Sequence, residues 1–148
     1  MLDRIKNTIF EKFWSEEKKW VFFSGYDSAK NLLFSHGVVH TDKSLRNVLE
    51  DVYKTHVQAR LDEARYLAID VMLDIIEITN QDDIRDLSPK EFGFLVVDKE
   101  DETTGIMLPN TTWVDDVKTV LYTIKQKYGI HGKVTIYAFR TERFVVAK

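Results

Sequence analysis

The chain has 148 residues, a usual size for one domain, and its composition of 44% hydrophobic and 12% aromatic residues can supply a proper core. With 21 basic and 24 acidic residues the formal net charge is −3, so the composition gives no general attraction to nucleic acid. The absence of cysteine excludes a disulfide framework, a thiolate nucleophile and a cysteine-based zinc site. Its apolar runs fall far short of the ~20 residues that span a bilayer, and the charged N-terminus does not resemble a signal peptide, so we expect a cytoplasmic protein.

The N-terminal part of the chain predicts a helix followed by a β-hairpin. Apolar residues recur at helical spacing within residues 1–19, which favours an amphipathic N-terminal packing helix. Residues 20–23 have strand composition and precede a turn-rich stretch, so residues 31–34 can return as the second arm of the hairpin.

The middle of the chain predicts a second helix and then a segment of ambiguous type. Asp42 or Ser44 can cap a helix that ends near Arg60. Residues 66–78 place acidic residues at helical spacing, yet their apolar residues alternate as in a strand. Their richness in isoleucine and valine favours the strand, because β-branched side chains fit a pleated surface better than a helical turn.

A second hairpin is expected after this segment. The polar connector 82–90 leads to two apolar arms, residues 92–97 and 105–108, which flank the acidic turn 98–102. The turn has oxygen ligands but lacks the residue order of an EF-hand loop, so we interpret it as a charged hairpin tip.

The chain ends in a predicted helix and strand. The helix is expected to begin at Trp113 and to stop at Gly129. Residues 134–139 predict a strand, which residues 144–146 can continue beyond a break at 140–143. Because hairpins are mixed with single helices, the order favours an α+β fold: a mainly antiparallel sheet packed with about three helices, with room for two lobes.

Two passages in the second half of the chain resemble the AMMECR family, which is named after an Alport-syndrome, midface-hypoplasia and elliptocytosis chromosomal region. Residues 87–96 contain Leu-Ser-Pro and then Phe-Gly-Phe-Leu-Val, and residues 105–109 read Gly-Ile-Met-Leu-Pro. They are similar to the family's leucine-x-proline, glycine-led strand and glycine-leucine-leucine-proline passage. Trp113 with its helix and the aromatic ending 137–144 also fit the family's C-terminal part. The resemblance implies that residues 1–148 form a single AMMECR-like domain.

The best-known signature of that family is altered in this chain. The signature Leu-Arg-Gly-Cys-Ile-Gly aligns with residues 32–37, where only Leu32 and Gly37 agree and Ser35 stands in place of the cysteine. The resemblance therefore implies the fold and not a reaction. Relatives are often associated with Memo-type and radical-SAM proteins, which implies a protein partner and leaves the cofactor unknown.

A polar cluster after the first hairpin turn supplies the candidate ligand-binding residues. These are Asn31, Ser35, His36, Gly37 and His40. A serine beside histidines can serve nucleophilic catalysis, but neighbours in a strand point to opposite faces, so Ser35 and His36 do not easily pair. His36 and His40 need a third ligand such as His56 or Asp42 to bind a metal, and nothing in the sequence fixes one. We therefore predict no metal site and assign no catalytic residue.

Asp70 and Asp74 share a face whether residues 66–78 form a helix or a strand. Paired carboxylates can perform acid–base chemistry or hold a cation. A solvated outer edge of a sheet is the commoner arrangement, and we expect it here.

Two functional hypotheses follow from the sequence. The leading one is a binding or accessory domain without classical catalytic machinery, which presents aromatic residues such as Trp14, Tyr26 and Trp113 to a protein partner or to a second copy. The alternative is an enzyme, or a protein that binds a small ligand or metal, with a cleft beside Asn31 to His40. Neither hypothesis involves nucleic acid or a membrane.

Overall fold

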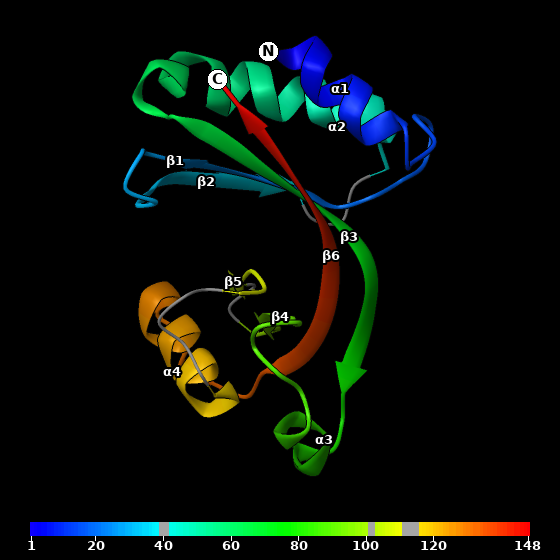
Figure 1. Cartoon of the computed structure of the whole chain (residues 1–148). Helices are drawn as coiled ribbons and strands as arrows, with labels where there is room; N and C mark the ends of the chain where they lie inside the picture. Colours follow the sequence, from blue (N-terminus) through cyan, green and yellow to red (C-terminus); the bar gives the residue numbers. More distant parts are fainter. Residues whose placement is uncertain (39–41, 101–102, 111–115) are drawn as a thin grey trace. The chain divides into compact units, whose positions relative to one another are not determined.

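The computed structural model describes residues 1–38, 42–100, 103–110 and 116–148. Within these ranges the chain forms four α-helices and six β-strands (Figure 1), and the strands follow the order β2-β1-β3-β6-β4-β5. The pairs β1–β2, β1–β3, β4–β5 and β4–β6 are antiparallel. The expected α+β fold with a mainly antiparallel sheet is therefore confirmed. In the described ranges, no helix is long and apolar enough to cross a membrane.

The chain divides into two compact units. Unit 1 comprises Met1–Met72 together with Glu142–Lys148, and unit 2 comprises Leu73–Thr141. The two longest strands, β3 (Tyr66–Ile78) and β6 (Thr135–Ala147), pass from one unit into the other. Each unit therefore has its own core and contains a part of both strands.

Unit 1 combines a hairpin and the first half of β3 with helices. Its other elements are α1 (Leu2–Phe10), β1 (Val21–Tyr26), β2 (Leu32–Val38), α2 (Leu45–Val52), a π-helical turn (Tyr53–Val57) and a 3₁₀ turn (Gln58–Glu63). Ser44 caps α2, because its Oγ accepts a hydrogen bond of 3.3 Å from the backbone N–H of Asn47. Of the two caps that the sequence allowed, the structure uses Ser44.

Alternation along the strands decides which side chains enter the core of unit 1. Val21 lies opposite Val71, and Phe23 lies opposite Ile69. All four side chains are fully buried. They belong to one hydrophobic cluster with the inner faces of α1 and α2, which contribute Ile5, Ile9, Leu45 and Leu49. The period of two in the strands and the helical period of α1 and α2 therefore meet in a single core.

Unit 2 packs one long helix against the remaining strands. Its elements are α3 (Gln81–Arg85), β4 (Gly93–Asp98), β5 (Thr103–Met107) and α4 (Val117–Tyr128), with the adjoining parts of β3 and β6. Val120 and Ile124 of α4 are buried with Phe94, Val96 and Ala138 of the sheet. Gly129 ends α4 in the left-handed conformation with φ of 65°, as the sequence predicted.

The sequence predicted the type of the central segment correctly and misplaced some boundaries. Residues 66–78 form a strand over their whole length, which confirms the preference drawn from their β-branched residues. The N-terminal helix ends at Phe10 rather than near residue 19, and the polar connector 82–90 contains part of the short helix α3. In the described residues α4 begins at Val117; Trp113 lies outside them.

The expected break at residues 140–143 is absent, because β6 continues through it. Arg140 and Arg143 lie within this stretch and pair with Asp74 and Asp70, respectively. Charged side chains thus reach partners on β3, which explains why a polar sequence remains a strand here. The prediction was wrong because it interpreted four polar residues as a turn. It did not take into account that two of them pair with residues of a neighbouring strand.

Candidate functional site

Asn31 and Ser35 have local structural partners in the first hairpin. The Asn31 side chain donates a hydrogen bond of 3.0 Å to Asp27 Oδ2, and its backbone N–H donates one of 2.9 Å to Asp27 Oδ1. These hydrogen bonds lower the pKa of the Asp27 carboxyl. Ser35 Oγ lies 3.4 Å from Oγ of the buried Ser24, its partner in the strand register. Both side chains therefore stabilise the hairpin.

Gly37 makes room for an aromatic ring. It lies opposite Phe22 in the register of β1 and β2, and a Cβ atom at this position would lie 2.1 Å from Phe22 Cδ1. Gly25 stands in the same relation to Phe34, with 2.4 Å to the nearest ring carbon. In both cases a phenylalanine ring covers a glycine on the neighbouring strand. The structure thus gives Gly37 a packing role.

His36 belongs to a compact group of nitrogen-bearing side chains. Its imidazole stacks on that of His56, with ring centroids 4.5 Å apart and an interplanar angle of 11°. The guanidinium carbon of Arg60 lies 4.9 Å from the centroid of Phe34, two residues before His36 on β2. Burial first, and then the charges of His56 and Arg60, lower the pKa of His36. We call His36, His56 and Arg60 the histidine–arginine cluster.

The neighbours of the histidine–arginine cluster limit its chemistry. Arg60 Nε donates a hydrogen bond of 2.7 Å to Glu63, and its Nη2 donates one of 3.3 Å to the carbonyl of Leu33. His40, the expected second histidine, lies outside the described residues. Within the described part of the chain, no three histidine, aspartate or glutamate side chains are placed to hold a metal ion. The cluster presents N–H donors rather than a set of converging metal ligands.

The two aspartates of β3 differ sharply in environment. Asp70 is 1% exposed and accepts hydrogen bonds of 3.0 Å from both Nε and Nη2 of Arg143. Asp74 pairs with Arg140 across 2.6 Å, and both of these side chains are about half exposed. The expected solvated edge thus describes Asp74 only. Asp70 is instead held in a buried, two-pronged ion pair.

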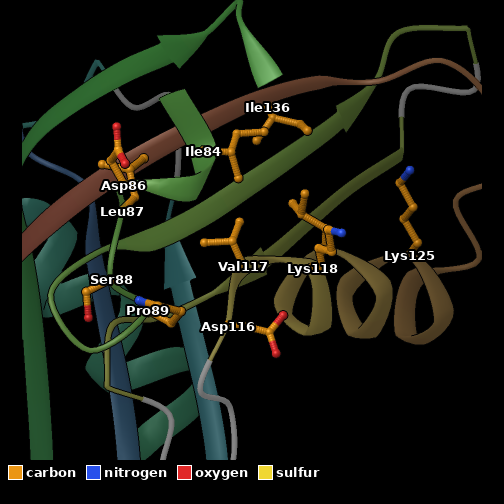
Figure 2. Close-up of a pocket in the computed structure, with 11 residues that line it drawn as sticks. Ile84, Asp86, Leu87, Ser88, Pro89, Asp116, Val117, Lys118, Lys125 and Ile136 are labelled. Atoms are coloured by element: carbon orange, nitrogen blue, oxygen red, sulfur yellow. The ribbon is translucent and has the colours of Figure 1, made fainter. Parts of the chain in front are cut away.

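A cavity lies in unit 2 (Figure 2). It is bounded by the end of α3 and the connector after it, by α4 and by β6. Its volume is about 930 Å³. The apolar lining consists of Ile84, Leu87, Pro89, Val117, Leu121 and Ile136. The polar lining consists of Asp86, Ser88, Asp116, Lys118 and Lys125. We call this cavity the α4 groove.

One face of α4 forms a wall of the α4 groove. Val117, Leu121 and Lys125 follow one another at intervals of four residues, so their side chains line the same side of the helix. Figure 2 shows Lys125 at one end of the groove, Asp86 toward the other, and Lys118 beside Val117 between them. The cavity therefore combines an apolar interior with two lysines of α4, one of which, Lys125, lies at an end.

Asp116 is engaged by the helix that it precedes. Its Oδ1 accepts a hydrogen bond of 2.9 Å from the backbone N–H of Thr119, and its Oδ2 accepts one of 2.9 Å from the Thr119 hydroxyl. These bonds, the backbone one first, lower the pKa of the Asp116 carboxyl. The carboxylate thus caps α4, and the charge of Lys118 also contributes to its lowered pKa.

Little in the sequence predicts the α4 groove. Its connector wall, Leu87 to Pro89, belongs to the passage that carries the AMMECR resemblance, and its helical wall is predicted only as part of a helix. Neither segment has a motif that predicts a cavity. The signal available was indirect: a connector with apolar residues that precedes a helix with lysines.

Comparison with known proteins supports the fold. No family model matches the chain, and no curated protein matches it. Among solved structures, the chain is similar to the crystal structure of the uncharacterized protein PH0010 from Pyrococcus horikoshii. The TM-score is 0.71 at 18% sequence identity, and the match covers 88% of this chain and 75% of that chain. At this identity the likeness shows the fold alone.

Proposed function

We propose that this chain is an AMMECR-like binding or accessory domain, and that its α4 groove binds an apolar group that carries an acid. The observation that carries the proposal is the groove itself, which joins an apolar interior to Lys118 and, at one end, Lys125. Its volume of about 930 Å³ lies within the range of ligand-binding cavities. A protein partner with an acidic apolar segment, or a free amphipathic acid, presents this chemistry.

The apolar and the charged residues of the groove contribute differently to binding. Burial of apolar surface contributes about 25 cal/mol per Å², so Leu121, Val117 and Ile136 supply affinity for a hydrophobic group. A lysine ammonium beside such a wall orients an anion and discriminates against a cation. The charges of Asp116 and Lys118 interact, so we assign the main contact with an acid to Lys125.

The resemblance to the AMMECR family supports the choice of this site. Leu87, Ser88 and Pro89 belong to the passage that is similar to the family, and all three line the groove. The family assignment, a protein partner and the cytoplasmic location all stay predictions. Of the aromatic residues expected at a partner surface, Trp14 is 69% exposed, whereas Tyr26 stacks on Tyr66.

Titration with the fluorescent amphipathic acid anilinonaphthalene sulfonate tests the groove. We expect the folded chain to bind the probe, and the variant Lys125→Glu to bind it about tenfold more weakly, because the reversed charge repels the sulfonate. The matched control is Lys127→Glu, which carries the same charge reversal on the same helix outside the groove lining. Equal affinity of the two variants would contradict the proposal.

Displayed peptide libraries distinguish the two sources of the acid. Peptides that bind the wild-type chain and Lys127→Glu but not Lys125→Glu should combine apolar residues with glutamate or aspartate. Enrichment of such peptides supports a protein partner. If only free amphipathic acids such as decanoate compete with the fluorescent probe, the groove binds a small molecule instead.

A small-anion site at the histidine–arginine cluster is the second candidate. The observation that favours it is the parallel stack of His36 and His56 beside Arg60, which places N–H donors close together. Inorganic phosphate is the probe: it should shift the imidazole NMR signals of both histidines in a saturable way. His36→Gln should abolish the shift of His56. Signals that do not respond to phosphate would exclude this candidate.

A further inference from the structure

The second half of β3 forms an edge of the sheet in unit 2. The register with β1 ends at the pair Val21 and Val71, and the backbone N–H of Met72 still donates to the carbonyl of Trp20 across 2.9 Å. The neighbours of β3 in the strand order are β1 and β6. Among the strands that the structure describes, residues 73–78 therefore have β6 on one side and no strand on the other.

This edge carries large apolar side chains that remain exposed. Leu73 and Ile75 are each 39% exposed and share one face of the strand, and Ile76, on the other face, is 50% exposed. The segment contains no proline, glycine or lysine. Proteins usually protect an edge strand with such residues, because its unpaired N–H and carbonyl groups invite another strand. An apolar edge strand without proline, glycine or lysine is thus a surface suited to strand addition.

The charges around this edge indicate which kind of partner strand would bind to it. Asp74 is balanced by Arg140 of β6, at 2.6 Å. From Glu77 to Asp86 the sequence carries four acidic residues and a single basic one, Arg85. Asp82 and Asp83 of α3 are exposed. The end of the edge strand is therefore acidic, and a basic strand complements it.

We propose that the edge of β3 at residues 73–78 binds an extended segment of a partner protein that has consecutive branched apolar residues and, at the end beside Glu77, lysine or arginine. Main-chain hydrogen bonds to the exposed edge would hold the segment. Its apolar residues would cover Leu73, Ile75 and Ile76, and its basic residues would face Glu77. This surface is separate from the α4 groove, whose lining contains no residue of β3.

A second copy of the chain fits the edge less well. In an antiparallel two-fold pairing, residues on the same face oppose each other, so the pairing is centred on a residue. A centre at Ile75 places Glu77 opposite Leu73 and Asp74 opposite Ile76. A centre at Ile76 places Glu77 opposite Ile75. Each register sets carboxylates against apolar side chains, whereas a basic apolar segment avoids this mismatch.

Binding of a synthetic valine–lysine peptide, with consecutive valines followed by two terminal lysines, to the full chain tests the proposal. We expect saturable binding and slower amide hydrogen exchange at residues 73–78. A matched peptide with glutamates in place of the terminal lysines should not bind, because Glu77 repels them. A valine–lysine peptide with N-methylated backbone amides should also fail, because it cannot donate the hydrogen bonds of a strand ladder. Binding that survives N-methylation would overturn the proposal.

Variants locate the binding surface. Ile76→Lys should weaken binding of the valine–lysine peptide at least about tenfold, through lost apolar contact and charge repulsion. Leu32→Lys is the matched control, since Leu32 is 57% exposed on the strand β2 of unit 1, and it should bind as the wild type does. Lys125→Glu should also leave the affinity unchanged. If gel filtration shows a dimer that Ile76→Lys dissociates, the edge belongs to a second copy and the proposal is wrong.

Discussion

At the scale of single residues, the first hairpin is shaped by side chains that fit one another closely. Phe22 and Phe34 each occupy the space above a glycine on the neighbouring strand. His36, on the face of β2 shared with Phe34, meets His56 from the π-helical turn. Two of the expected ligand-binding residues, Gly37 and His36, thus have definite structural neighbours, and the consequences can be measured separately.

The histidine stack should make stability depend on pH. The folded state lowers the pKa of His36 below the ordinary 6.5, so the unfolded chain takes up this proton first as the pH falls. The contribution of His36 is therefore present above pH 6.5 and is lost as the pH falls through the folded-state pKa. Urea unfolding at about pH 8 and about pH 5 should show a smaller loss of stability in His36→Gln than in the wild type.

His131→Gln is the control for this prediction, because His131 is an exposed histidine of unit 2. Its pH dependence should match that of the wild type. If His36→Gln and the wild type lose the same free energy of unfolding between the two pH values, the histidine stack has no influence on stability.

Gly37→Ala should destabilise unit 1. The added Cβ would lie 2.1 Å from Phe22 Cδ1 and 2.9 Å from the carbonyl oxygen of Val21, and this backbone oxygen cannot rotate away. Overpacking of this kind costs about 1–3 kcal/mol. Chemical denaturation checks the value, with Ser28→Ala in the exposed hairpin turn as the control. A loss in Gly37→Ala no larger than in Ser28→Ala would show that the ring moves aside freely.

At the scale of elements, α4 connects local sequence to the proposed site. Asp116 caps the helix, Gly129 ends it, and the face that bears Leu121 and Lys125 lines the groove. The stop at Gly129 was predictable because it depends on the glycine and its immediate neighbours. The groove was not, because it requires the connector with Leu87 to lie beside α4, and that contact is tertiary.

Loss of the cap should loosen the groove from one end. Asp116→Ala removes the acceptor for the Thr119 backbone N–H, so the first turn of α4 should fray. We expect a thermal midpoint a few degrees lower and faster amide exchange at Lys118 and Thr119. Asp116→Asn keeps a capping oxygen and should restore most of the protection. Equally fast exchange in both variants would mean that the cap does not hold this turn.

At the scale of the whole molecule, the strands β3 and β6 run through both units. The sequence predicted β3 as a strand from its valines and isoleucines, but it divided β6 at residues 140–143. The difference lies in the source of the information: branched residues indicate a strand by themselves, whereas Arg140 and Arg143 do so only beside Asp74 and Asp70. A local sequence pattern does not reveal ion pairs between residues that are far apart in the chain.

The two arginines of β6 provide a matched test of what burial adds to such a pair. Arg143→Met leaves the carboxylate of Asp70, 1% exposed, without its two-pronged partner, and should cost about 3 kcal/mol. Arg140→Met removes the partner of Asp74, which is half exposed and can return to water, and should cost less than about 1 kcal/mol. Because β3 and β6 belong to both units, the loss in Arg143→Met should lower the unfolding midpoint of signals from unit 1 and unit 2 together. Circular dichroism and residue-resolved hydrogen exchange measure the two quantities, and equal costs for the two variants would show that the buried pair contributes no more than the exposed one.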